Sequence, residues 1–422
     1  MRRYRLSATI AVAASLSQLG CGPDPLDHPR ALYAENKLAE AYPLFAALAE
    51  RRPRHAEAHA WLAETARRTR RYDEARDAAL AAVALDSCSA FALTVLGSLF
   101  QPIYSDWGPA DADSAWHYYR QAVACDPDDG NAWVGLWMEA LRRGEAAWEH
   151  RALASLGTSG FLTPTVLAYN RWVLRSLPPD ALLLTSGDWD TYPALALQAV
   201  GQVRTDVGVV NLSMLNLPWY VRLVSERYGL AVPLDDDALD RLQGSGRLAD
   251  SVVRVWRAQS VARLLGRPLA QAATVGSAPD DAGVGMFQDA GPFRLLVTAA
   301  PAADTSALRR ALADVASGDF AGPEVSPADR SAIRMSAAVR RPLTSHVLAT
   351  AFGYSGVMRS VGDSVEATRA LAWADSFARE VGLSEEWREM LRRSIVPAPS
   401  RPPPPVPSVP RRGGVQPRRP AR

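Results

Sequence analysis

Polar side chains follow two neighbouring predicted strands of this 422-residue chain, at the points where the chain turns from strand to helix. Residues 181–185 and 207–212 are short apolar runs, and the turn residues after them favour strands. Adjacent parallel strands end at the same edge of a sheet, which is where open sheets bind ligands. Carboxylates, amides and hydroxyls gathered there could hold a sugar, a hydrated cation or a phosphate. The candidate ligand-binding residues are Ser186, Asp188, Asp190, Thr191, Asn211, Ser213 and Asn216.

Each of these residues also has a purely structural interpretation. Asp190 or Thr191, and likewise Asn216, stand where helix caps are expected, and Asp188 is an ordinary turn residue. Asp188 and Asp190 could act as acid and base, but residues two apart on a turn need not face one another. Ligand binding and helix capping therefore both remain open at this edge.

Other motifs with catalytic chemistry are missing from the sequence. Residues 353–356 lack the glycine spacing of a nucleophile elbow, and His346 has no evident acid partner. The sequence contains no Walker loop, no dinucleotide glycine fingerprint and no Cys/His metal spacing. We therefore predict no catalytic residue, no metal and no cofactor, and retain an enzyme only as an alternative class.

The elements that would position the polar edge alternate between strand and helix over residues 165–335. This alternation predicts a small parallel α/β domain, followed by a helical segment at 340–395. Further strands are expected at 270–275 and 293–297. Helices are expected at 194–200, 219–228, 248–265, 305–317, 345–358, 365–381 and 384–394.

Residues 24–156 predict a stack of helical hairpins. The spacing from Ala41 to Ala75 equals the period of the tetratricopeptide repeat (TPR), which is about 34 residues. The spacing from Ala75 to Ala115 is longer, which indicates an insertion near the turn at 101–113. The region resembles TPR proteins, which implies a concave groove for a protein or peptide partner. The alternative is that the hairpins only brace the next domain. The predicted fold class is thus TPR hairpins, then α/β, then helices.

Two cysteines fall in the third hairpin. Cys88 lies at the start of its first helix and Cys125 at the end of its second, and these two ends are neighbours. A disulfide is expected if the chain reaches an oxidising compartment. The alternative is two buried free thiols.

The amino terminus has the pattern of an export signal. Arginines precede an apolar run at 6–19, which is too short to span a bilayer. Residues 18–22 (Gln-Leu-Gly-Cys-Gly) resemble the end of a bacterial lipoprotein signal, which implies a signal peptide at 1–21 and lipidation of Cys21. The alternative is a secretory signal that is cleaved nearby and leaves Cys21 as a thiol. The pattern predicts an extracytoplasmic, membrane-anchored lipoprotein of the cell envelope.

The carboxyl terminus, residues 396–422, contains ten prolines and six arginines and predicts a disordered tail. The tail is either simply solvated, or it meets a partner or an acidic surface. The net charge is +2, and the leader and tail together carry +9, so the remaining chain carries about −7. This balance argues against a basic groove, and we predict no nucleic-acid partner.

A second resemblance covers residues 177–220. It rests on Thr-Ser-Gly-Asp-Trp-Asp-Thr-Tyr-Pro at 185–193 and Asn-Leu-Ser-Met-Leu-Asn at 211–216. These residues resemble the soluble carboxy-terminal region of bacterial membrane proteins related to protein O-mannosyltransferases. The membrane-embedded half of that family has no counterpart here, so glycosyl transfer is not carried over. The sequence therefore predicts a protein-binding scaffold; the alternative is an accessory domain that recognises a glycan or is associated with a glycosyltransferase.

Overall fold

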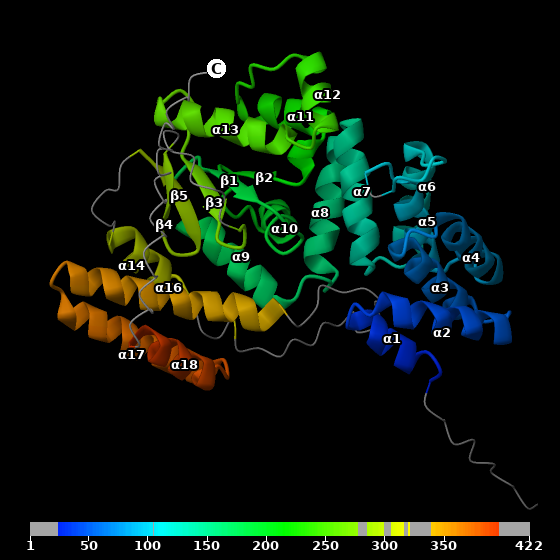
Figure 1. Cartoon of the computed structure of the whole chain (residues 1–422), viewed down its shortest axis with the longest axis horizontal. Helices are drawn as coiled ribbons and strands as arrows, with labels where there is room; N and C mark the ends of the chain where they lie inside the picture. The colour runs from blue at the N-terminus through cyan, green and yellow to red at the C-terminus, as the bar shows by residue number, and fades with distance from the viewer. Residues whose placement is uncertain are drawn as a thin grey trace, which may run out of the picture.

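The computed structural model describes residues 24–103, 105–276, 285–298, 305–315, 320 and 339–395. The predicted signal peptide at 1–21, with its candidate lipidation site Cys21, and the predicted tail at 396–422 lie outside these residues. Helices make up most of the described chain, and a small sheet lies near its middle (Figure 1). None of the described helices is both long and apolar enough to cross a bilayer.

The first eight helices pack as consecutive pairs, α1 with α2, α3 with α4, α5 with α6 and α7 with α8 (Figure 1). Each pair is a helical hairpin. Short turns join the two helices of each pair except α5 and α6, whose connection is longer. The helices are α1 (Asp27–Ala34), α2 (Leu38–Arg51), α3 (Ala56–Arg68), α4 (Tyr72–Leu85), α5 (Ala90–Phe100), α6 (Ala112–Cys125), α7 (Gly130–Arg143) and α8 (Ala146–Thr158).

The spacing of these helices follows the period seen in the sequence. The starts of α2 and α4, of α3 and α5, and of α6 and α8 are each separated by this period, about 34 residues. The steps from α4 to α6 and from α5 to α7 are longer, and by the same amount. The additional residues lie between α5 and α6, in the non-helical connection where the sequence predicted an insertion. The second, third and fourth hairpins therefore repeat the same layout, whereas α1 begins closer to α3 than this period.

Small residues allow the helices of the stack to approach closely. Ala41, Ala75 and Ala115, which were predicted to be equivalent, are all fully buried. The ring of Tyr119 on α6 lies between Gly97 on α5 and Gly135 on α7. A Cβ atom added at Gly97 would lie 2.7 Å from this ring, and one added at Gly135 would lie 2.2 Å from it. Only glycine fits at these two positions.

A chain of buried polar groups fixes the same region. The Tyr119 hydroxyl donates to Gln101 Oε1 at 3.0 Å, and Gln101 Nε2 donates to Glu139 Oε1 at 2.9 Å. Glu139 is fully buried and pairs with Arg142 at 3.0 Å. A buried carboxylate without such partners would be strongly destabilising. These contacts tie the start of the inserted connection to α7.

The structure joins Cys88 and Cys125 in a disulfide, with their Cα atoms 5.3 Å apart. Cys88 lies just before α5, and Cys125 is the last residue of α6. The Cys88 residue is exposed, so it does not fit the alternative of two buried thiols. The bond therefore links the start of α5 to the end of α6 in the third hairpin.

Helix α9 (Pro164–Ser176) follows the four hairpins in the chain and packs against helices of the domain after it. It begins one repeat period after α7. The repeat spacing therefore continues to residue 164, where the sequence predicted that the next domain begins. One continuous hydrophobic core runs from Leu93 on α5 to Trp387 near the end of the described chain. The hairpins and the α/β region are therefore packed together.

The sheet is mixed, and the prediction of a parallel sheet is wrong for its second half. The strand order is β2-β1-β3-β5-β4; β1 pairs in parallel with β2 and β3, whereas β5 pairs antiparallel with β3 and β4. Residues 290–292 are too few to form the crossover that parallel neighbours need. The strands are β1 (Leu182–Thr185), β2 (Gly208–Asn211), β3 (Leu269–Ala272), β4 (Met286–Asp289) and β5 (Phe293–Val297).

Helices cover both faces of the sheet (Figure 1). Helix α10 (Tyr192–Gly201) lies with α9 on one face, and α11 (Pro218–Tyr228), α12 (Asp236–Gly244) and α13 (Leu248–Val261) lie on the other. The last described helices pack against α9 through α14 and α16. Their bounds are α14 (Thr305–Ala313), α16 (Arg340–Ser360), α17 (Ser364–Glu380) and α18 (Ser384–Ile395).

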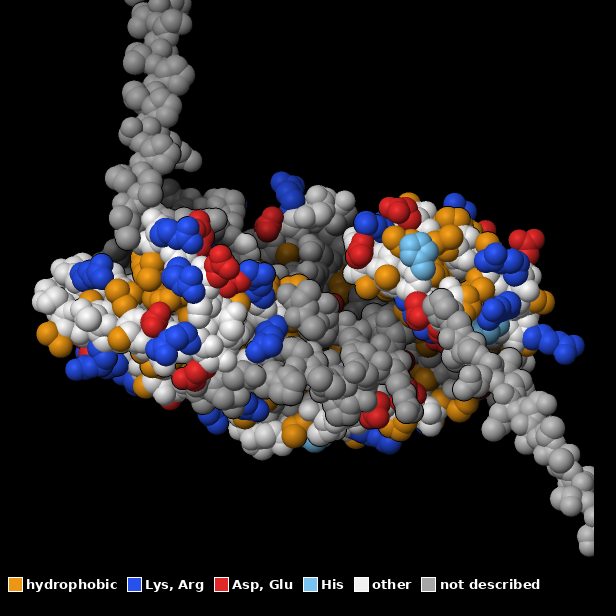
Figure 2. Space-filling model, turned by 90° about the horizontal axis from the view of Figure 1, so that it is seen from below, with side chains coloured by type: hydrophobic (Ala, Val, Ile, Leu, Met, Phe, Trp, Pro, Cys, Tyr) orange, Lys and Arg blue, Asp and Glu red, His pale blue; other side chains and the backbone are white. Residues whose placement is uncertain are grey.

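Acidic and basic side chains are interspersed over the face shown in Figure 2. Many arginines of the described surface are paired with a nearby carboxylate, as Arg222 is with Asp236 at 2.6 Å. A surface site that binds a charged ligand is therefore expected where a few side chains of one charge have no ion-pair partner.

Candidate functional site

The candidate site lies at the carboxyl ends of β1 and β3. From β1 the chain goes to β2 on one side, and it returns to place β3 on the other side of β1. The connections after β1 and β3 therefore diverge, which is the topological arrangement at which open sheets form ligand crevices. Thr274, just after β3, donates its hydroxyl proton to Asp190 Oδ2 at 2.6 Å. The two connections are thus in direct contact.

Asp190 organises the loop that follows β1. Its carboxylate accepts the backbone N–H of Ser186 at 3.1 Å and that of Gly187 at 2.9 Å, in addition to the Thr274 hydroxyl. The Asp190 residue is buried, with 4% of its surface exposed. Its oxygens are occupied within the protein, so its role is to hold the loop.

Thr191 and Asn211 also act within the fold. Both are buried, and Asn211 Nδ2 donates to the Thr191 hydroxyl at 2.9 Å. The Thr191 hydroxyl also lies 2.8 Å from that of Thr185, so it links β1 to the end of β2. Thr191 occupies the N-cap position of α10 without making a side-chain cap. The capping interpretation is thus wrong for Thr191, whose hydroxyl is used across the sheet.

Asn216 does not cap the helix that follows it in the chain. Its Nδ2 donates to the carbonyl of Ser213 at 3.2 Å, and its Oδ1 accepts the N–H of Ala249 in α13 at 3.4 Å. The N-cap residue of α11 is Leu217, which makes no side-chain cap. The exposed Ser213 hydroxyl donates to the carbonyl of Ser186 at 3.3 Å and joins the two loops.

Asp188 is the member of the predicted set whose carboxylate is left open. It is exposed, and the described residues offer it no hydrogen bond and no ion pair. Partial desolvation by the surrounding loop, together with the negative charge of Asp190, raises the pKa of Asp188. Trp189 beside it is 44% exposed, and its carbonyl accepts a hydrogen bond from Asn170 Nδ2 at 2.7 Å. The loop therefore presents a free carboxylate and an aromatic ring on a fixed backbone.

Sequence reasoning missed a polar pair beneath this loop. The Tyr169 hydroxyl on α9 lies 2.6 Å from His346 Nδ1 on α16, across 177 residues of sequence. Burial lowers the pKa of His346 to about 4, so its ring is neutral at neutral pH. Burial and the charge of Asp190 raise the pKa of Tyr169. No local motif marks either residue, because the pair forms only when α16 packs on α9.

The described residues contain no cluster of three or more His, Cys, Asp or Glu side chains placed to hold an ion. The exposed members of the predicted set are Asp188, Ser213 and Asn216. These groups suit hydrogen bonding to a hydroxyl-rich ligand.

The comparisons with known proteins identify a domain in this region. Residues 167–241 match the family described as TMEM260-associated domain 2, which is linked to protein O-mannosyltransferase-like proteins. The match runs from α9 into α12 and contains all seven predicted site residues. It confirms, for this domain, the predicted link to protein O-mannosyltransferase-like proteins. A search of curated proteins finds no match to the chain.

Proposed function

We propose that the chain is an exported, lipid-anchored scaffold of the cell envelope, and that its hairpins are TPR units that bind a protein partner. The observation that supports this most is the repetition of one packing scheme. Equivalent alanines at Ala41, Ala75 and Ala115 are all fully buried. Stacks of such hairpins form extended surfaces suited to protein binding.

The proposed location rests on two features. The leader at 1–21 and Cys21 have the pattern of a lipoprotein signal. The bond between Cys88 and Cys125 suits an oxidising compartment outside the cytoplasm. Together they support attachment to a membrane with the folded chain on its extracytoplasmic side.

Several exposed side chains on the hairpins are available to a partner. Leu80 on α4 is 44% exposed, and Arg68 at the end of α3 is exposed as well. We expect a photo-crosslinking amino acid placed at either position, in cells, to capture a defined protein. Val365 on α17, which is 70% exposed and lies outside the hairpins, is the control. Crosslinks from Val365 alone, or from none of these positions, would contradict the proposal.

A second function, glycan recognition at the edge of the sheet, is favoured by the open Asp188 carboxylate beside the exposed Trp189. Sugar rings pack against aromatic faces, and a carboxylate accepts hydrogen bonds from sugar hydroxyls. We expect Asp188→Asn to weaken binding of a mannose-containing glycan at least about tenfold. Asp237→Asn, an exposed change on α12, should leave that binding unchanged. Equal binding by the wild-type chain and Asp188→Asn in a glycan array would remove this candidate.

A further inference from the structure

Two tryptophans and three arginines interleave on the surface of α6, α7 and α8. We call Trp116, Arg120, Arg143, Trp148 and Arg151 the Arg–Trp patch. The two indole rings meet edge to face, 5.7 Å apart. The Arg120 guanidinium lies 5.1 Å from the Trp148 ring, and Arg151 lies 4.8 Å from the same ring. Arg143 stacks on Trp116 at 5.2 Å.

The charges of this patch are not all neutralised. Arg143 pairs with Asp113. Arg120 and Arg151 are exposed, and the described part of the chain gives neither of them a hydrogen bond or an ion pair. Elsewhere the pattern differs: Arg76 stacks on Trp107 at 5.6 Å but also pairs with Asp77 at 2.7 Å. Two guanidinium groups in the patch therefore lack an anionic partner.

The contact with Trp148 holds the Arg120 and Arg151 guanidinium groups in positions from which they can bind an anion. The Arg120 and Arg151 guanidinium groups lie over the Trp148 ring at cation–π distance, and within the described residues their N–H groups have no hydrogen-bond partner. Those N–H groups form a rigid fork that matches a carboxylate in a two-point contact. Because Trp148 restrains both side chains, they lose less conformational freedom when an anion binds.

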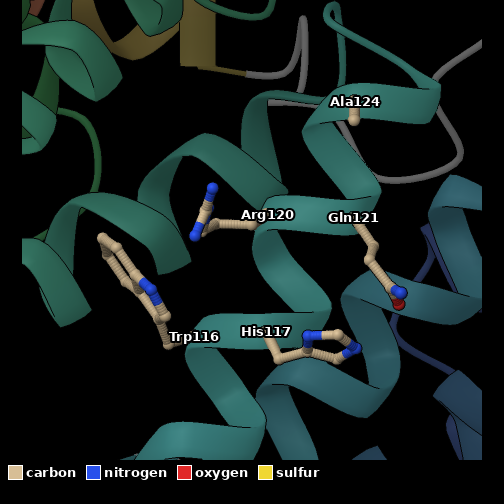
Figure 3. Close-up of a pocket in the computed structure, with 5 residues that line it drawn as sticks. All are labelled: Trp116, His117, Arg120, Gln121 and Ala124. Carbon is tan, nitrogen blue, oxygen red and sulfur yellow. The ribbon is translucent and has the colours of Figure 1, made fainter.

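Trp116 and Arg120 also line an open surface pocket on α6, with a volume of about 340 Å³. Figure 3 shows Trp116 and Arg120 extending to one side of α6, and His117 and Gln121 to the other. The pocket is open to solvent rather than closed around a small molecule, so Arg120 is accessible from it.

The spacing of the charges also fits an extended peptide. Arg120 and Arg151 both lie within 5.1 Å of the Trp148 ring centre, so roughly 10 Å or less separates them. Side chains two residues apart on an extended strand are about 6.6 Å apart and point to the same side. Acidic residues at alternating positions can therefore reach both guanidinium groups at once.

We propose that the Arg–Trp patch binds an extended acidic peptide segment of a protein partner. Carboxylates at alternating positions of the peptide pair with Arg120 and Arg151. This inference names a partner class for the proposed scaffold and rests on that proposal. It also places the contact on α6 and α8, the second helices of their hairpins.

The test is fluorescence anisotropy with the purified full-length protein and a labelled octapeptide of alternating Glu and Ser. We expect binding that weakens at least about tenfold in Arg120→Ala/Arg151→Ala, because each charge-assisted pair contributes more than a neutral hydrogen bond. Arg120→Lys/Arg151→Lys keeps the charge but loses the planar fork, so it should bind with intermediate affinity. Arg76→Ala, the matched stacked arginine, should bind like the wild-type chain. The exposed positions predict unchanged melting temperatures in all variants.

Other outcomes would overturn the inference. Equal binding of a Gln/Ser octapeptide would show that carboxylates are not recognised, and equal affinity in the double alanine variant would place the contact elsewhere. Binding of an oligogalacturonate in preference to the peptide would assign the patch to acidic sugars instead. If crosslinking at Leu80 or Arg68 still captures a partner while the acidic peptide fails to bind, the scaffold proposal stands and this inference falls.

Discussion

Replacing Gly135 by valine is expected to lower the free energy of unfolding by about 3 kcal/mol, because the site has no room for a side chain. A Cβ atom there would lie 2.2 Å from the Tyr119 ring. That ring cannot move away, since Gly97 packs on it from α5 and its hydroxyl donates to Gln101. Urea unfolding followed by far-ultraviolet circular dichroism measures the change.

The neighbouring hairpin, α5 with α6, offers a control and a rescue. Gly108 lies in the connection between α5 and α6, and a Cβ atom there would meet nothing within 4 Å. Gly108→Val should therefore change stability by no more than about 0.5 kcal/mol. Adding Tyr119→Ala to Gly135→Val frees the contested space, so the two changes should cost less together than their separate effects predict. Equal stabilities of Gly135→Val and Gly108→Val would contradict the described packing.

Removing the disulfide should have an effect of similar size. The bond between Cys88 and Cys125 closes a loop with a sequence separation of 37. Cross-linking a loop of this length restricts the unfolded chain and is worth about 3 to 4 kcal/mol. We expect Cys88→Ala/Cys125→Ala to unfold at a correspondingly lower urea concentration.

A reductant gives an independent measurement of the same contribution. Dithiothreitol should lower the unfolding midpoint of the wild-type chain towards that of the double variant and leave the variant unchanged. An identical midpoint for wild type with and without reductant would show that the bond is not formed or adds nothing to stability.

The hairpins could be predicted because similar residues recur in the sequence at a fixed period. A regular repeat of small and large residues fixes the spacing of the hairpins, and α2 and α4, which contain the equivalent Ala41 and Ala75, begin one period apart. The first strands could be predicted from turn chemistry, since Gly187 follows β1 and Pro193 lies in the first turn of α10. β5 was expected at 293–297 and lies there.

The direction of β5 and the existence of β4 were missed. The signal was the Gly-Pro pair at Gly291 and Pro292, which marks a turn. Gly291 has a φ of +94°, which other residues rarely adopt, and the tight turn there reverses the chain. Strands joined by so short a turn must be antiparallel. The alternating pattern before them led us to extend the parallel arrangement too far.

The candidate site was predicted as one set of seven residues, but packing divides that set. Asp190, Thr191 and Asn211 became internal links once β1, β2 and the connection after β3 met, whereas Asp188 stayed open. Thr274, which completes the shell of Asp190, lies 84 residues away in sequence. Contacts between residues so far apart in sequence leave no local pattern. The spacing of residues can therefore predict where the edge of the sheet lies, but not what each side chain does there.

The most direct test of the central claim, that this is an exported and lipid-anchored scaffold, is the intact mass of the chain purified from the membranes of cells that express it. The account predicts a polypeptide that begins at Cys21, carries the added mass of lipid, and lacks two hydrogens because Cys88 and Cys125 are joined. A soluble cytoplasmic chain that begins at Met1 and has free thiols would contradict it.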